Sequence, residues 1–332
     1  MTEPNPAFPD LHPLPELPAK VTVYEVGARD GLQAEKQVID TTTKVEFINR
    51  LTSAGFSAVE ATSFVSPRWV PQLADAAEVM GAIDRPEGVR LPVLTPNTKG
   101  LQRAIDAGAR EVAVFVSATE SFAKANLAST VAGALDSARR VTSDALAAGL
   151  RVRSYVSMCW GDPWEGAVAP ATVGEVTAAL ADAGCATVSL GDTIGVATAG
   201  GVVDVVAACW DAGVENSQLA LHFHDTYGQA LSNVQAGLRL GVTEYDASAG
   251  GLGGCPFAGS ATGNLATEDL LWLLQGLGIS TGVDLAAVVA ATTWLAERMG
   301  REPQSAVARA LGARRGADSP TGAAATSGDA DA

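Results

Sequence analysis

A repeated unit of helix, glycine and short strand places the strongest constraint on how this chain folds. Six times, a helical pattern closes on Ala-Gly or Leu-Gly, and an apolar, β-rich run follows. Glycine just past a helix suits the left-handed C-cap, and short apolar runs after it are typical of buried parallel strands. The six glycines are Gly55, Gly108, Gly149, Gly184, Gly213 and Gly241. This alternation predicts a parallel sheet covered by helices.

Two more β-rich runs bring the number of expected strands to eight. The strands are expected at residues 21–27, 57–64, 90–96, 110–118, 151–159, 187–193, 218–225 and 243–249. Eight strand-then-helix units in a row predict an α/β fold of the closed (β/α)₈ type, a TIM barrel. The alternative is a doubly wound open sheet, but no G-x-G-x-x-G follows the first strand. A helical pattern from about 283 to 311 predicts extra C-terminal helices.

The two ends of the chain differ in composition from the middle. Residues 1–20 are rich in proline and show no recognisable signal or transit peptide, so we expect a disordered leader. Residues 312–332 are small, polar and acidic, which is typical of a disordered tail. The barrel and its helical appendage are therefore expected to occupy residues 21–311.

Charge and cysteine usage narrow the class of protein. A net charge of −15 argues against nucleic acid as a partner, since nucleic-acid binding relies on clustered Lys and Arg. No apolar run approaches the length of a membrane span. The four cysteines are widely spaced, form no CxxC pair and lie mostly in apolar segments; they are Cys159, Cys185, Cys209 and Cys255. This pattern favours a reducing, cytoplasmic setting.

Polar residues gather where the expected strands end. In a TIM barrel the chemistry takes place at the carboxyl ends of the strands. The residues found there include Glu25, Arg29, Asp30, Glu60, Asp192, His222 and His224, followed by Cys255 and Asn264. Ionisable residues with only a packing role would be scattered along the strands, so this clustering predicts a functional site.

His222 and His224 are two of only three histidines, and the third, His12, lies in the leader. Side chains two apart on a strand share a face, and two neutral imidazoles side by side suit a metal ion. An isolated H-x-H pair is equally consistent with two hydrogen-bonded histidines. Asp30, which alone would more often cap or form an ion pair, and Asn264 would add oxygen ligands. Such a set without thiolate favours Mg²⁺ or Mn²⁺, with Zn²⁺ and Co²⁺ left open.

Three further residues suit catalytic roles. Arg29 beside a metal site would stabilise a developing oxyanion, or form a structural ion pair with Glu60 or Glu25. Glu60 interrupts an apolar strand, which is costly without a charged partner, so we expect it to orient Arg29 or to relay a proton. Cys255 follows four glycines in five residues. Its thiol would act as a proton donor or nucleophile, or else as a metal ligand.

Seven stretches, collinear over roughly residues 21 to 300, carry a resemblance to a known family. They are EVGARDGLQAE (25–35), VEATSFVSPRWVPQLAD (59–75), LTPNTKG (94–100), SLGDTIGV (189–196), HFHDTYGQALSN (222–233), GLGGCPF (251–257) and GNLATEDL (263–270). Together they resemble the 3-hydroxy-3-methylglutaryl-coenzyme A lyases, a metal-dependent lyase family built on the TIM barrel.

The resemblance implies cleavage of 3-hydroxy-3-methylglutaryl-CoA to acetyl-CoA and acetoacetate, a retro-Claisen-type step of leucine degradation, by a homodimer. The positions that match the family's metal ligands are Asp30, His222, His224 and Asn264. The resemblance also implies that Arg29 stabilises the enolate of acetyl-CoA, that Cys255 protonates it, and that Glu60 is a carboxylate needed for activity.

Three alternatives stay open at this point. Ala28 stands where the family often has proline, so a lyase for a longer 3-hydroxy-3-methyl acyl-CoA is one alternative. A Claisen-condensing synthase on the same barrel is another, although such enzymes typically carry D-T-T-L-R-D-G and H-x-H-N-D and lack the GLGGCP stretch. A catalytically silent barrel that serves as a scaffold is the third, and the intact set of site residues argues against it.

Overall fold

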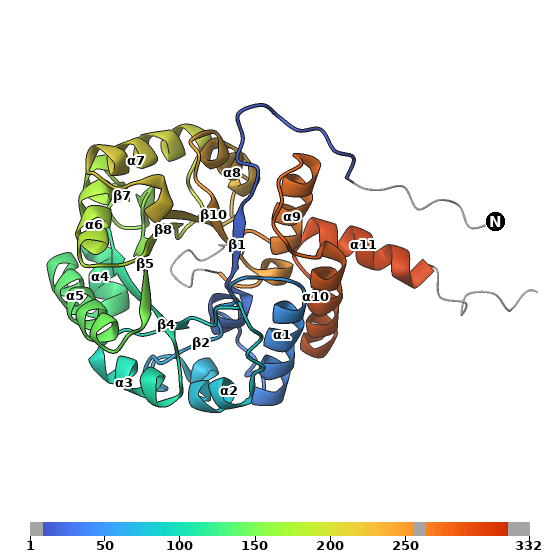
Figure 1. Ribbon diagram of the computed structural model, residues 1–332, viewed down its shortest axis with the longest axis horizontal. Coiled ribbons are helices and arrows are strands. Elements are labelled where there is room, and N and C mark those ends of the chain that lie inside the picture. The colour runs from blue at the N-terminus through green and yellow to red at the C-terminus, as the bar shows by residue number, and fades with distance from the viewer. Residues whose placement is uncertain (1–8, 255–262, 318–332) are drawn as a thin grey trace, which may run out of the picture.

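Eight parallel strands follow one another around a central axis, with helices on the outside (Figure 1). The computed structural model describes residues 9–254 and 263–317 of the 332-residue chain. Along the sheet the strand order is β1-β10-β9-β8-β5-β4-β3-β2. The strands are β1 (Thr22–Glu25), β2 (Thr62–Ser63), β3 (Val93–Leu94), β4 (Glu111–Ser117), β5 (Arg151–Ser157), β8 (Thr187–Asp192), β9 (Leu219–Phe223) and β10 (Glu244–Ala247).

Backbone hydrogen bonds between the first strand and the segment before β2 close the sheet. The Glu25 amide donates to the Ala58 carbonyl at 3.2 Å, and the Glu60 amide donates to the Glu25 carbonyl at 2.8 Å. Since β1 also pairs with β10 on its other side, the eight-stranded sheet closes on itself. The predicted TIM barrel is confirmed, and each of the eight strands lies within a predicted run.

Helices surround the barrel in chain order. They are α1 (Thr41–Ser53), α2 (Ala76–Ala82), α3 (Thr98–Asp106), α4 (Glu120–Leu127), α5 (Val131–Ala147), α6 (Pro170–Asp182), α7 (Ala199–Asp211), α8 (Ala230–Arg239), α9 (Thr267–Gly276), α10 (Leu285–Met299) and α11 (Ala306–Ala317). All six glycines of the repeated unit have positive φ, between 76° and 99°. This is the left-handed conformation that ends a helix and turns the chain back toward the sheet. Among the described residues, no helix is long and apolar enough to cross a membrane.

Short elements complete the chain. They are a π-helical turn, η1 (Gly27–Gly31), the 3₁₀ turns η2 (Pro71–Leu73), η3 (Asn216–Gln218) and η4 (Ala249–Gly251), and an antiparallel pair, β6 (Gly161–Asp162) with β7 (Gly166–Ala167). The first strand thus ends at Glu25, two residues earlier than predicted, because the chain winds into η1.

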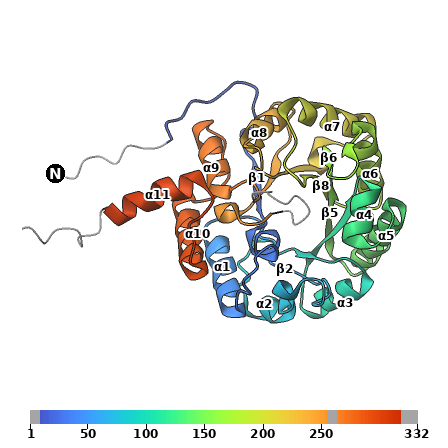
Figure 2. The same cartoon turned by 180° about the vertical axis from the view of Figure 1, so that it is seen from behind.

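Helix α10 packs against α1 and α9, and α11 packs against α9 and α10 and points away from the barrel, as Figures 1 and 2 show from opposite sides. They are the extra C-terminal helices that the sequence predicts. The segment between them reaches the mouth of the barrel, where the Gln304 amide donates to the Gly250 carbonyl at 3.0 Å. The Gln304 side chain accepts a hydrogen bond from the Gly263 amide at 3.2 Å.

Residues 9–20 and the end of α11 extend the described structure beyond residues 21–311 on both sides. Residues 9–20, expected to belong to a disordered leader, contact the barrel: the His12 amide donates to the Gly276 carbonyl at 2.8 Å, and the Ser280 amide donates to the Ala19 carbonyl at 3.0 Å. At the other end, α11 continues to Ala317, beyond the expected boundary at residue 311. Local composition did not reveal these contacts, because the partners lie far away in the sequence.

Candidate active site

Three of the four predicted metal ligands meet at the carboxyl ends of the strands. Asp30 lies on η1 directly after β1, His222 lies in β9, and His224 follows that strand. One potential ligand atom from each residue lies within 4.8 Å of the others. The two imidazole rings are 5.3 Å apart between centroids. Parallel strands end at the same rim, which is why residues so distant in sequence converge here.

Asn264, the fourth predicted ligand, is oriented toward the same group. Its side-chain nitrogen donates to an Asp30 carboxylate oxygen and to the Leu252 carbonyl, both at 2.9 Å. These bonds leave its Oδ1 buried with no hydrogen-bond partner among the described residues, and the same holds for Nδ1 of His224. Buried polar atoms without partners are costly, whereas a cation would use them. The residues therefore fit a divalent metal ion.

The protonation states of Asp30 and His224 suit the same purpose. Although burial acts to raise it, the pKa of Asp30 is lowered to about 2 by Arg29 and the two histidines. Burial, followed by the neighbouring His222, lowers the pKa of His224 to about 4. At neutral pH Asp30 is thus an anion and His224 is neutral, as metal coordination requires.

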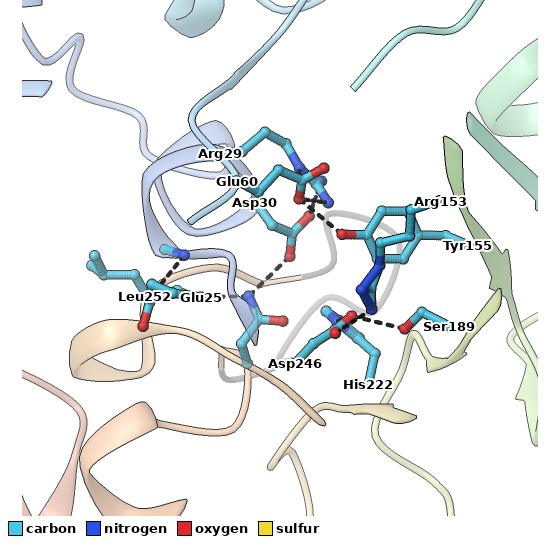
Figure 3. Close-up of polar contacts among 12 residues, drawn as sticks. Glu25, Arg29, Asp30, Glu60, Arg153, Tyr155, Ser189, His222, Asp246 and Leu252 are labelled. Carbon is cyan, nitrogen blue, oxygen red and sulfur yellow. Dashed lines mark hydrogen bonds and ion pairs between the residues drawn. The ribbon is translucent and has the colours of Figure 1, made fainter. Parts of the chain in front are cut away.

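Arg29 is fixed between two carboxylates (Figure 3). Its Nε and Nη2 approach the same oxygen of Glu60 at 2.8 and 2.7 Å, and its Nη1 contacts Asp30 at 2.5 Å. The Tyr155 hydroxyl donates to that Glu60 oxygen at 2.9 Å. Of the two partners considered for Arg29 from the sequence, Glu60 is the one it contacts. These contacts stabilise a fully buried Glu60 and hold the guanidinium beside Asp30.

Glu25 has a different role: it links the first and last strands. Its carboxylate accepts hydrogen bonds from the amides of Gly27 and Ala249, at 2.7 and 2.9 Å, and from the Thr267 hydroxyl at 2.6 Å. Burial raises the pKa of this carboxyl to about 7.

Glu268 stands next to Glu25 and anchors the same turn. It accepts hydrogen bonds from the Gly250 amide at 3.0 Å and from the Thr292 hydroxyl of α10. Burial raises the pKa of Glu268 to about 7 as well. The two carboxyls together fix η4, from which the chain leads toward residue 255.

A second cluster of polar residues lies deeper between the strands, and the sequence did not predict it. Arg153 of β5 bonds to Asp246 and Glu244 of β10, and Asp246 also contacts Ser189 and His222. We expected ionisable residues to gather at the carboxyl ends; this expectation is wrong for Arg153 and Glu244. The signal was present, since a charge within an apolar strand requires a buried partner.

The remaining predicted residues have various positions. Cys255 lies outside the described residues. Asp192 accepts hydrogen bonds from the backbone amides of Val196 and Ala197, so it orders its own loop. The three described cysteines are free and buried. Four cations near strand ends, Lys36, Arg68, Lys99 and Lys124, are exposed.

The fold and the site define a class: a TIM-barrel protein whose mouth holds a partly buried carboxylate, two buried imidazoles and an amide beside a fixed arginine. A family model described as HMGL-like matches residues 20–294. The chain belongs to the HMGL-like family.

Relatives and a solved structure agree with this assignment. The chain is 51% identical over 302 residues to "Hydroxymethylglutaryl-CoA lyase, mitochondrial" of Arabidopsis thaliana; the match covers 91% of this chain and 64% of that protein. It is 50% identical over 293 residues to the protein of that name from Bos taurus, covering 88% of this chain and 90% of the relative. The crystal structure of hydroxymethylglutaryl-CoA lyase from Pseudomonas aeruginosa superimposes with a TM-score of 0.88 at 45% identity, covering 90% of this chain and 99% of that one.

Proposed function

We propose that this protein is a hydroxymethylglutaryl-CoA lyase, which cleaves 3-hydroxy-3-methylglutaryl-CoA to acetyl-CoA and acetoacetate in leucine degradation. The observation that carries the proposal is the convergence of Asp30, His222, His224 and Asn264 beside Arg29 at the mouth of the barrel. The family and its relatives add the acyl-CoA substrate. The enzyme is a carbon–carbon lyase.

The reaction breaks one carbon–carbon bond. The tertiary hydroxyl loses its proton, and the oxygen becomes the ketone of acetoacetate. The bond between the carbinol carbon and the thioester α-carbon breaks, and its electron pair forms the enolate of acetyl-CoA. A proton then adds to the α-carbon and yields acetyl-CoA.

The chain's own residues support both charge changes. Asp30, His222, His224 and Asn264 would hold a divalent cation, with Mg²⁺ or Mn²⁺ favoured by the oxygen and imidazole ligands. When bound, such a cation lowers the pKa of a hydroxyl group that it contacts.

Arg29 would then stabilise the enolate oxygen. Its guanidinium is already held by Glu60 and Asp30, so little reorganisation is needed as charge develops. Glu60 acts through Arg29 as a positioning residue. By its resemblance to the family's cysteine, Cys255 would protonate the enolate carbon.

A direct assay tests the proposal. Purified protein incubated with Mg²⁺ and 3-hydroxy-3-methylglutaryl-CoA should release acetoacetate, and addition of EDTA should stop it. The variant Asp30→Asn keeps the shape of the side chain but removes the anionic ligand, so it should release far less. Folded, metal-supplied protein that forms no acetoacetate from this thioester contradicts the proposal. Release from a thioester with a longer acyl chain alone would reassign the substrate.

Location and assembly belong to the proposal too. We infer a cytoplasmic homodimer: the described cysteines are free and buried, which suits a reducing compartment, and the family resemblance suggests two subunits. Light scattering on the purified protein measures the assembly directly.

A further inference from the structure

Asp246 is a fully buried carboxylate that contacts a metal-site histidine from behind. Its side chain is 0% exposed, and its Oδ2 lies 3.2 Å from Nδ1 of His222. Residues Asp246 and His222 are direct neighbours in the register of β10 and β9. Figure 3 shows the two side chains close together, with Ser189 and Arg153 beside them.

The other contacts of Asp246 fix which atom faces the histidine. Arg153 donates from Nη2 to Oδ1 at 2.5 Å, and the Ser189 hydroxyl donates to Oδ2 at 2.7 Å. A carboxylate only accepts hydrogen bonds. The contact with Nδ1 is therefore a hydrogen bond only if His222 carries its proton on Nδ1, and this tautomer leaves the lone pair on Nε2.

Arg153 cannot turn away from this arrangement. It is 1% exposed, its Nη1 bonds to Glu244 at 2.7 Å, and its guanidinium lies 3.8 Å from the centre of the Tyr24 ring. A planar guanidinium held by two carboxylates and an aromatic face has little freedom. Asp246 is thus held by the charge of Arg153 through Oδ1 and contacts His222 through Oδ2.

We infer that Asp246 is a positioning residue for the metal site: together with Arg153 and Ser189, it sets the tautomer and the ring orientation of His222, so that Nε2 is available to a divalent cation. The inference rests on the metal site of the proposed function. Outer carboxylates of this kind typically change metal affinity or activity roughly 10- to 100-fold when they are removed.

The variant Asp246→Asn reverses the pattern of hydrogen bonding. Arg153 still needs an acceptor at the Oδ1 position, so the amide oxygen turns toward Arg153 and the NH₂ group turns toward His222. An NH₂ donor favours the tautomer with an unprotonated Nδ1, and the proton moves to Nε2. A protonated Nε2 cannot bind a metal ion, although the shape and packing of residue 246 are kept.

Metal binding is the first measurement. Titration of metal-free protein with Mn²⁺, followed by the EPR signal of the free ion, should show a dissociation constant about 10- to 100-fold higher in Asp246→Asn than in the wild type. The matched control is Glu244→Gln, which removes the other carboxylate from Arg153 but does not contact His222. Because the glutamine oxygen still accepts the hydrogen bond from Arg153, this control should stay within about threefold of the wild type.

The histidine tautomer is the second measurement and requires no substitution. The chain has only three histidines, so ¹⁵N-histidine NMR spectra of the metal-free wild type in mildly alkaline buffer are simple to assign. Nδ1 of His222 should carry the proton in the wild type, and Nε2 should carry it in Asp246→Asn.

The outcomes separate the inference from the function on which it rests. Wild-type protein that binds no Mn²⁺ refutes the metal site itself. If the wild type binds Mn²⁺, a proton on Nε2 of His222 in the wild-type spectrum, or a folded Asp246→Asn with unchanged affinity, overturns the role of Asp246 alone. Should the variant fail to fold, the wild-type spectrum still decides the question.

Discussion

At the scale of single residues, the site depends on partners that fix each polar group before any ligand arrives. Arg29 has three of its nitrogen atoms bonded to Glu60 and Asp30, and Asn264 has its amide nitrogen bonded to Asp30 and Leu252. Arg29 keeps further N–H groups for a ligand, because a guanidinium has five donors, and Asn264 keeps its Oδ1. A side chain fixed in this way loses little conformational entropy when it meets substrate.

Replacement of Arg29 by lysine tests this reasoning. An ammonium group keeps the charge but cannot contact Glu60 and Asp30 at once with the geometry of the guanidinium fork. We expect kcat for acetoacetate formation to fall roughly 100- to 1000-fold, whereas KM changes far less. Steady-state kinetics measure both constants.

The control is Arg90→Lys, since Arg90 also bonds a buried carboxylate, Glu111, but takes no part in the site. Its kcat should match that of the wild type. A kcat for Arg29→Lys within tenfold of the wild type would show that charge alone is enough at this position, contrary to the argument from geometry.

How much the sequence predicted also differs from residue to residue. Asp30, His222 and His224 follow strands with a clear local pattern, so the rule for strand ends in a barrel brought them together correctly. Arg153 and Asp246 were missed because their meaning depends on register: Arg153 of β5 and Asp246 of β10 meet across the interior of the barrel, about 93 residues apart. No local pattern encodes such a pair.

At the scale of elements, η4 joins the barrel to its helical appendage. Glu25 on β1 and Glu268 on α9 bind consecutive amides, those of Ala249 and Gly250, and Thr292 of α10 bonds to Glu268. The turn is therefore held from three elements. The sequence predicted these elements individually, since glycine caps and β-branched runs are local signals, but it did not predict the buried carboxyls between them.

The variant Glu268→Gln should change how stability depends on pH. Burial raises the pKa of Glu268 to about 7, above the value of about 4.5 expected when the chain unfolds. The folded state then binds more protons than the unfolded state, so the contribution is present at low pH and is lost as pH rises through 7. The glutamine variant lacks this titration. Between pH 5 and 8 the wild type should lose roughly 2 kcal/mol more of its free energy of unfolding than the variant.

Urea unfolding at several pH values measures this difference. Glu297→Gln is the control, because Glu297 lies on the exposed side of α10; its pH profile should follow that of the wild type. Parallel profiles for wild type and Glu268→Gln would mean that the Glu268 carboxyl titrates alike in the folded and unfolded chains. Glu25, with a pKa raised to about 7 by burial, remains in the variant, so part of the pH dependence should persist.

At the scale of the whole molecule, closure of the barrel creates the site. Asp30 follows the first strand and His222 lies in the seventh of the eight barrel strands, about 190 residues later in the chain. They meet because β10 lies between β1 and β9 and because Glu25 and Glu60 close the sheet on the other side. The unfolded chain has no such arrangement, so a ligand of this site stabilises only the closed barrel.

A divalent metal should therefore raise the unfolding temperature of the entire chain. At a free Mn²⁺ concentration 100-fold above the dissociation constant, binding to the folded state alone adds about 2.7 kcal/mol. For a protein of this size, with an unfolding entropy of about 2 cal/mol/K per residue, the added free energy corresponds to a shift of roughly 4 °C. Differential scanning calorimetry with and without Mn²⁺ measures this shift in unfolding temperature, and EDTA should reverse the shift.

Asp30→Asn should lose most of the shift, whereas Asp211→Asn, a change at an exposed residue at the end of α7, should keep it. An equal shift in Asp30→Asn would place the stabilising ion elsewhere on the protein, because only at the barrel mouth does the Asp30 carboxylate lie within reach of both imidazoles.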